Sequence, residues 1–263
     1  MNVWTKRSID LANQGNYLDL LHLIYPMPVN LRRKISNETR QQINFLFTNR
    51  KSEELIRVLL DQEIFPIKDS YVAYIRRDKD SIVRNPQTIH RLAFALYNTG
   101  LPEMFDRMTA AKETNRQIGP MFRAWLKSLP VRFIVDYDPF LRYGGDAILC
   151  GSDAHLAGFA KQYLGYTRDK GLDLVAKING KFVIGEAKFL TDFGGHQNAQ
   201  FEDAILTLQS ALNETIYEVK TIAVLDGVLY IEGNNKLHGK LREFDDDTVV
   251  LSAVLLRDYL CSL

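Results

Sequence analysis

Hydrophobic and polar positions follow two patterns along the chain. Through the first half, apolar residues recur at helical spacing, and Ser, Asn or Pro stands where several of these segments begin. In the second half, short apolar runs rich in β-branched residues alternate with helical segments, which is typical of an α/β fold with helices on the faces of a mixed sheet. The pattern predicts helices at about residues 36–47, 52–60, 69–77, 86–98, 101 onward, 113–129, 153–165, 200–212 and 255–260, and strands at 131–135, 221–225, 228–231 and 249–253.

A β-hairpin centred on Asn179 and Gly180 is the most specific local prediction. Two runs of β-branched and apolar residues flank this Asn-Gly pair, the preferred sequence of a two-residue type I′ turn. With these two residues as the turn, Asp173 on the first strand lies directly opposite Glu186 on the second. Facing partners point to the same side of the sheet, and side chains alternate along a strand, so Lys188 shares that side. The hairpin therefore predicts a cluster of two carboxylates and one ammonium group.

Two interpretations of this cluster are open. In the first, the three groups form ion pairs on an exposed hairpin, worth about 0–1 kcal/mol. In the second, the acids bind a divalent cation such as Mg²⁺, which takes one or two carboxylates and keeps several waters, and the lysine acts beside it on a phosphate. Apolar residues on both faces of the hairpin favour the second, because they predict a buried hairpin whose polar end opens onto a cleft. These residues are Leu172, Leu174, Val175, Val183, Ile184 and Ala187.

The same residues carry a resemblance to a nuclease superfamily. Asp173 is followed, after 12 intervening residues, by Glu186, Ala187 and Lys188, and this spacing resembles the PD-(D/E)xK signature. The chain departs from the signature at Leu172, where many members have proline. The resemblance implies a restriction-endonuclease-like α/β fold, a mixed sheet flanked by helices, which here follows an all-helical N-terminal region.

A stretch ahead of the hairpin narrows this resemblance. Residues 115–122 read Asn-Arg-Gln-Ile-Gly-Pro-Met-Phe, and in front of a nuclease core they resemble type II restriction endonucleases. The resemblance implies Mg²⁺-dependent hydrolysis of double-stranded DNA at a short palindromic sequence, by a homodimer that is functionally paired with a DNA methyltransferase. Two other hypotheses remain: a repair or recombination nuclease of the same fold, and a DNA-binding module whose hairpin acids are structural.

The resemblance also implies a role for each residue of the cluster. Asp173 and Glu186 are expected to ligate the metal ion together with the carbonyl oxygen of Ala187. Lys188 is expected to position the attacking water and to stabilise the pentacovalent phosphate. Some relatives use a further acid on the helix before the hairpin, and the chain offers two candidates for it: Asp153 and, as the second choice, Asp146.

Arginines at the end of a predicted helix are the first candidates for DNA contacts. Segments 55–60 and 69–77, joined by a short break, resemble a helix-turn-helix, and Arg76 and Arg77 close its second helix. Arginine at such a position suits phosphate and guanine contacts. Helix pairs joined by short loops occur in many all-helical domains, so an ordinary helical pair is the alternative.

Two further groups of side chains are candidates for DNA contacts. Asn, Gln and Arg present paired donors and acceptors that match base edges and phosphates. One group lies in the predicted helix at 113–129, and the other follows two glycines that permit close approach to a DNA backbone. For the second group, a plain loop capping the next helix is the alternative. The candidates are Asn115, Arg116 and Gln117, and His196, Gln197 and Asn198.

Charge is unevenly distributed, although the net charge is only +1. Residues 1–130 hold 20 Lys and Arg against 13 Asp and Glu, whereas residues 131–263 hold 13 against 19. We therefore expect a basic helical region, 1–130, for DNA recognition and dimerisation, and a nuclease core at 131–263. Ordinary solvated Lys and Arg are the alternative for the basic region. Only two cysteines, no secretion signal and no apolar run near 20 residues predict a cytoplasmic protein without disulfides.

Overall fold

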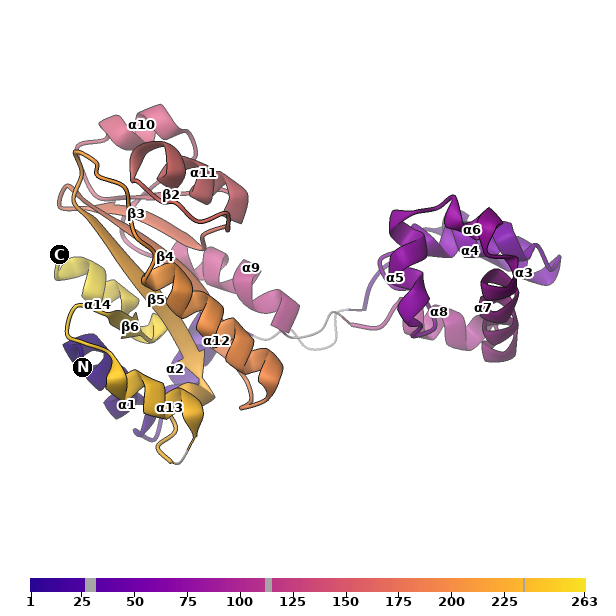
Figure 1. The fold of residues 1–263 in the computed structure, drawn as a ribbon, viewed down its shortest axis with the longest axis horizontal. Helices are drawn as coiled ribbons and strands as arrows, with labels where there is room; N and C mark the ends of the chain where they lie inside the picture. The colour runs from indigo at the N-terminus through magenta and orange to yellow at the C-terminus, as the bar shows by residue number, and fades with distance from the viewer. Residues whose placement is uncertain (27–31, 112–114, 234) are drawn as a thin grey trace. The chain divides into compact units, whose positions relative to one another are not determined.

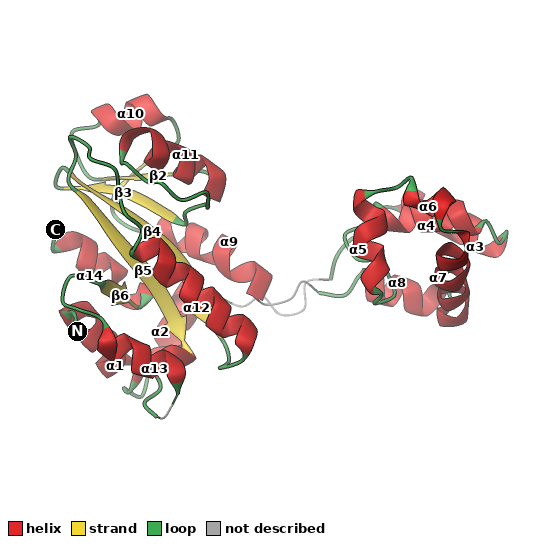
Figure 2. Cartoon of the chain, in the orientation of Figure 1, coloured by secondary structure: helices red, strands yellow, loops and turns green. Residues whose placement is uncertain are grey.

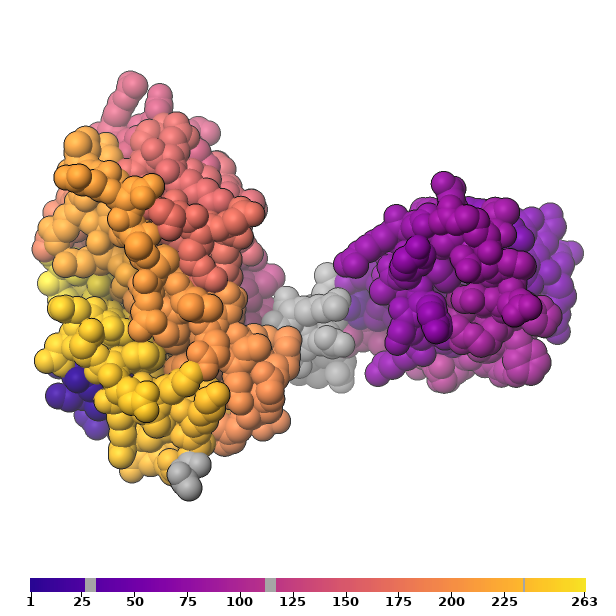
Figure 3. Space-filling view, in the orientation of Figure 1, coloured from indigo at the N-terminus to yellow at the C-terminus, as the bar shows by residue number. Residues whose placement is uncertain are grey.

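The chain forms two compact units, shown in Figure 1. One comprises Pro28–Glu113 and the other combines Met1–Met27 with Thr114–Leu263; we call them the helical unit and the sheet unit. The helical unit is therefore an insertion in the sequence of the sheet unit. Each unit is closely packed in itself (Figure 3). The structure, a computed structural model, describes residues 1–26, 32–111, 115–233 and 235–263.

The described part of the helical unit is built from helices and their connections (Figure 2). Ser36 and Asp69 cap two of these helices, because their side-chain oxygens accept backbone N–H groups at 3.1 and 2.9 Å. Ile43, Leu55 and Leu92 lie in the core that the helices share. The predicted helices are confirmed as α3 (Asn37–Thr48), α4 (Ser52–Leu60), α5 (Ser70–Arg77), α7 (Pro86–Thr99) and α8 (Leu101–Met108), joined by the short α6 (Ser81–Arg84).

A six-stranded mixed sheet organises the sheet unit, in the order β1-β2-β3-β4-β5-β6. β2 and β3 pair antiparallel, as do β3 and β4, and the other neighbours pair parallel. This arrangement confirms the predicted mixed α/β class. The strands are β1 (Arg132–Ile134), β2 (Ala147–Leu149), β3 (Leu174–Ile178), β4 (Lys181–Leu190), β5 (Val219–Gly227) and β6 (Val249–Leu251).

Helices flank the sheet and bury its apolar side chains in two clusters (Figure 1). One cluster, around Phe159 and Phe182, joins β2, β3 and β4 to α10 (Tyr137–Arg142) and α11 (Asp153–Tyr163). The other, around Phe122 and Tyr230, joins the sheet to the remaining helices. These are α1 (Val3–Ala12), α2 (Tyr17–Ile24), α9 (Asn115–Leu126), α12 (Gly195–Leu208), α13 (Lys236–Glu243), α14 (Leu256–Cys261) and the 3₁₀ turns η1 (Val228–Tyr230) and η2 (Ala253–Leu255).

β3 and β4 form the predicted hairpin. Asn179 and Gly180 both have positive φ, 49° and 79°, as a type I′ turn requires. The ladder pairs Ile178 with Lys181 next to the turn and continues in the same register along the hairpin. The predicted register is therefore confirmed as far as the pair of Leu174 and Gly185, because the turn sequence fixes it locally.

Two segments that were predicted in the sheet unit have a different structure, and five of its elements were not predicted: α1, α2, α10, α13 and β2. Residues 228–230 form η1 rather than a strand, and β5, which was predicted to end at 225, extends to Gly227. A short buried apolar run such as this one does not distinguish a strand from a helical turn. α12 begins at Gly195, earlier than the helix predicted at 200–212, and so includes His196, Gln197 and Asn198.

The compact units do not follow the expected division at residue 130. α1, α2 and α9 belong to the sheet unit, although they lie in the basic first half of the sequence. Thr5 donates through Oγ1 to the carbonyl of Val250 at 2.8 Å, and the N–H of Ser252 donates to Ser8 Oγ at 2.9 Å. These partners lie more than 240 residues apart in the sequence, so no local sequence pattern predicts their contact.

Candidate active site

Asp173, Glu186 and Lys188 meet at the end of the hairpin that lies away from its turn. Asp173 directly precedes β3, and the other two occupy alternate positions on β4. The ammonium group of Lys188 donates to Glu186 Oε1 and lies 3.8 Å from Asp173 Oδ2. The structure thus brings together the three side chains of the predicted cluster.

Asp173 reaches this cluster from a different backbone position than the register predicts. The ladder ends at the pair of Leu174 and Gly185, so Asp173 is not a regular partner of Glu186. Its N–H donates to the carbonyl of Gly185 at 3.0 Å, and its Oδ2 accepts the N–H of Ala187 at 2.9 Å. The side chain of Asp173 therefore caps a backbone group of β4, which holds the carboxylate beside the strand.

The cluster is largely withdrawn from water. The side chains of Glu186, Asp173 and Lys188 are 2%, 12% and 25% exposed. Burial raises the pKa of the Asp173 carboxyl above its ordinary value, with the Lys188 ammonium opposing the shift and the Glu186 carboxylate adding to it. A carboxylate in such a position is stabilised when a cation approaches it.

Lys188 is held in its charged form. Burial acts to lower the pKa of this lysine, but the carboxylates of Glu186 and Asp173 outweigh burial and raise it above its ordinary value. A raised pKa keeps the ammonium group protonated at neutral pH. Lys188 is thus suited to donate hydrogen bonds and to stabilise negative charge, rather than to accept a proton.

Two further cationic side chains, which the sequence did not assign to the site, lie beside the cluster. Lys170, in the loop before β3, lies with its Nζ 2.9 Å from Glu186 Oε1. Arg123, on α9, donates to Asp153 Oδ1 at 2.5 Å and lies 3.6 Å from Asp173 Oδ1. Neither residue has a motif spacing that marks it, because one lies in a loop and the other on a distant helix.

The cluster of Asp173, Glu186 and Lys188 lines, with Lys170, a pocket of about 350 Å³. Asp153, the first candidate for a further acid, lines this pocket from the start of α11. Asp146 does not, because its Oδ1 accepts the N–H of Asn179 at 2.9 Å and so lies at the turn end of the hairpin. The lining residues are Asp153, Ala154, Lys170, Gly171, Asp173, Glu186 and Lys188.

The donor set of the pocket suits a hard divalent ion. Within the described segments, no group of three or more His, Cys, Asp and Glu side chains is arranged to hold a metal ion. Two carboxylates are nevertheless enough for Mg²⁺, which keeps several of its waters. Glu186 Oε2 is buried and has no hydrogen-bond partner in the described part of the chain, so this oxygen has an unused acceptor position.

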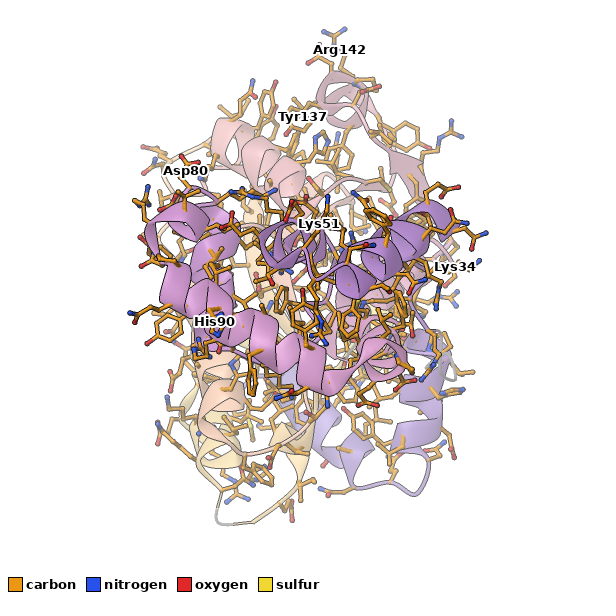
Figure 4. The ribbon with its side chains drawn as sticks, turned by 90° about the vertical axis from the view of Figure 1, so that its right-hand side faces the viewer. Lys34, Lys51, Asp80, His90, Tyr137 and Arg142 are labelled. Carbon is orange, nitrogen blue, oxygen red and sulfur yellow. The ribbon has the colours of Figure 1, made fainter. Side chains whose placement is uncertain are left out.

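Neighbouring arginines of the helical unit have different surroundings. Arg76 donates to the backbone carbonyls of Leu60 and Gln62, both at 2.9 Å, and so ties α5 to the end of α4. Arg77 is exposed, and no ion pair or hydrogen bond of its side chain is found in the described ranges. Lys34, Lys51, Asp80 and His90 are further ionisable residues of the helical unit and are labelled in Figure 4.

The remaining candidates for DNA contacts lie in helices. The side chains of Asn115 and Arg116 fall outside the described residues, and Gln117 is half-buried in α9. His196, Gln197 and Asn198 lie in the first turn of α12 instead of a loop. Gln197 is buried and pairs with Thr191 at 3.3 Å, and Asn198 donates to the Phe193 carbonyl at 3.3 Å, whereas His196 is exposed.

Comparison with known proteins gives one match that extends over almost the whole chain. A family model described as the Tsp45I type II restriction enzyme matches residues 2–263. No curated protein matches the chain, and no solved structure does. No helix of the described segments is long and apolar enough to cross a membrane.

Proposed function

The chain belongs to the Tsp45I type II restriction enzyme family, and from this premise we propose that it cuts double-stranded DNA with Mg²⁺ at the pocket around Asp173, Glu186 and Lys188. Family membership makes the protein a site-specific deoxyribonuclease. The convergence of two carboxylates and an ammonium group in one pocket is the observation that supports this location. It also supports assignment to the PD-(D/E)xK nucleases.

Each residue has a role that its surroundings support. Asp173 and Glu186 hold Mg²⁺, together with the Ala187 carbonyl, and the unpaired Glu186 Oε2 is the oxygen best able to accept it. When bound, the ion supplies Lewis-acid activation and neutralises charge on the phosphate. Lys188, held protonated by its neighbours, orients the attacking water and donates to the phosphate oxygens as negative charge develops. Asp153 is the further acid of the pocket.

Recognition of DNA is proposed for side chains of both units. Arg77 of α5 and His196 of α12 are exposed, so each is able to contact a phosphate or a base without first losing a buried partner. Arg76, Gln197 and Asn198 complete this set; their side chains are already hydrogen-bonded within the protein. Asn115, Arg116 and Gln117 of α9 are proposed as a second set. We further propose a homodimer, because two copies related by a two-fold axis cut both strands of a palindromic site, and a functional pairing with a DNA methyltransferase.

Digestion of one long, fully sequenced duplex tests the proposal. Purified protein with Mg²⁺ is expected to give discrete, reproducible bands, and EDTA to abolish them. Smearing or structure-dependent cuts favour a repair nuclease of the same fold. Absence of cleavage with retained binding favours a module whose acids are structural, contrary to the proposal. Sedimentation of the protein with and without DNA checks the dimer.

A further inference from the structure

We infer that Lys170 is a placeholder cation: it holds the Glu186 carboxylate while the pocket is free of metal, and it releases that carboxylate when a divalent ion binds. The inference rests on the proposed metal site. It concerns a residue outside the predicted cluster, and it assigns Asp203 of α12 as the group that receives Lys170 after the exchange.

The surroundings of Glu186 give the first reason. Its side chain is 2% exposed, and a carboxylate withdrawn from water to this degree needs compensating charge. Two ammonium groups supply that charge at a single oxygen, since Lys170 and Lys188 both contact Oε1. The other oxygen, Oε2, has no hydrogen-bond partner in the described ranges. An incoming ion thus meets one unused oxygen and one that two lysines already share.

Lys170 is the lysine that is able to leave. It contacts a second carboxylate, Asp203 Oδ2, at the same time as Glu186. The second carboxylate near Lys188 is Asp173, at 3.8 Å, and this residue is itself a proposed metal ligand. When an ion takes both proposed ligands, Lys170 therefore keeps a partner. The exchange leaves no buried ammonium group without a negative charge beside it.

Both Asp203 and the backbone of Lys170 are fixed in place. Arg168 donates to the backbone carbonyl of Asp203 at 3.2 Å and lies 3.4 Å from its Oδ1. On the other side, Gly171 packs so closely on the start of α11 that a Cβ there would lie 2.6 Å from the Cβ of Asp153. Glycine is thus required directly after Lys170. The fold thus fixes the backbone of Lys170 on one side and Asp203 on the other, which keeps Lys170 between Glu186 and Asp203.

This arrangement makes Lys170 a positioning residue that competes with metal. Removing its charge takes a cation away from the ligand Glu186, so a divalent ion binds more tightly. The same change leaves Glu186 with less compensation when no ion is present, so the metal-free protein is less stable. Substitution of a residue that has only a structural role lowers stability by the same amount with and without metal.

Thermal unfolding in a Ca²⁺ titration without DNA tests the inference. Relative to wild type, Lys170→Met is expected to melt at a lower temperature without Ca²⁺, and its stabilisation by Ca²⁺ is expected to begin at a concentration at least roughly threefold lower. Lys170→Arg keeps the charge and is expected to match wild type. Lys161→Met is the control, because Lys161 pairs at 2.8 Å with Asp169 at the surface of the same region.

An equal loss of stability in Lys170→Met with and without Ca²⁺, or weaker Ca²⁺ binding, overturns the inference. Absence of Ca²⁺ stabilisation in the wild type instead removes the metal site, and with it the inference, so the two failures are distinct. Should Lys170→Met not fold, Asp203→Asn carries the test: without its second partner Lys170 competes harder, and Ca²⁺ binding should weaken. Unchanged or tighter Ca²⁺ binding in Asp203→Asn overturns the inference.

Discussion

Most of the ion pairs described in the helical unit lie at its surface, whereas the sheet unit pairs several charged side chains away from water. Lys79 and Asp61, for example, are 48% and 59% exposed, while Glu186 is 2% exposed beside two lysines. A surface ion pair loses little hydration and stabilises little. A buried charge is costly to keep, so its position marks a place where fold or function compensates for it. This difference between the two units marks the pocket of the sheet unit as such a place.

Two buried acids extend the contrast within the sheet unit. Asp226 is fully buried on β5, and its neighbours are hydroxyl and N–H donors rather than cations. Burial raises the pKa of Asp226 to about 6, although hydrogen bonds from Ser252 and Tyr25 oppose the shift. Asp226 thereby joins α2 and η2 to the sheet, and it does not line the pocket around Glu186. Glu186 has cations beside it and an oxygen left free, which is the arrangement of a ligand.

The largest effect is expected at the pocket. Replacing Lys188 with Ala removes the cation proposed to stabilise the phosphate, so DNA cleavage is expected to slow by on the order of 10³-fold. Asp173→Ala should be at least as severe, because a proposed metal ligand is lost. Single-turnover cleavage in Mg²⁺ measures the rate, and binding of the same duplex in Ca²⁺ should persist for Lys188→Ala.

Lys181→Ala is the matched control for the pocket, since Lys181 lies on the same strand next to the turn and pairs with Glu218 at 3.7 Å. It should cleave at the wild-type rate. Wild-type turnover by Lys188→Ala or by Asp173→Ala contradicts the assignment of the pocket.

A smaller effect, on stability, is expected at Asp226. The raised pKa of the Asp226 carboxyl means that the folded protein binds a proton there more tightly than the unfolded chain does, so the free energy of unfolding falls as pH rises from about 4 to about 6. Ionisation of Asp226 therefore lowers the free energy of unfolding by about 3 kcal/mol. Asp226→Asn should remove that component, as measured by urea unfolding at several pH values. Asp138→Asn, an exposed control, should not; identical pH profiles for wild type and Asp226→Asn rule the interpretation out.

The neighbours Arg76 and Arg77 should separate stability from DNA binding. Arg76→Ala loses two hydrogen bonds to backbone carbonyls, so it is expected to lower the free energy of unfolding by about 1–2 kcal/mol. Arg77→Ala should leave stability almost unchanged and weaken binding of duplex DNA at low salt. Equal DNA affinity of Arg77→Ala and wild type removes Arg77 from the proposed contact surface.

The smallest effect is expected at the exposed pair of Lys79 and Asp61. Lys79→Ala should change the free energy of unfolding by less than about 1 kcal/mol, and added salt should reduce the difference further. Urea unfolding at two salt concentrations measures it. A loss as large as that of Arg76→Ala would mean that exposure is a poor guide to the energetics of this unit.

Local signals account for what the sequence predicted well. The Asn179-Gly180 turn fixes the hairpin register, and strand alternation then brings Glu186 and Lys188 to one side. Contacts with Lys170 and Arg123 had no such signal, because loop geometry and helix packing create them. The approach of Asp173 to Ala187 likewise depends on the chain leaving the ladder. The metal ion, the DNA contacts and the dimer stay predictions.

The docking of α1 on β6 has a consequence for the order in which the protein is made. α1 leaves the ribosome before β6, and the groups that accept and donate its hydrogen bonds, at Val250 and Ser252, are synthesised more than 240 residues later. Residues 32–111 have a core of their own and are able to fold during that interval. The sheet unit, by contrast, gains its full set of contacts only once translation has passed Ser252.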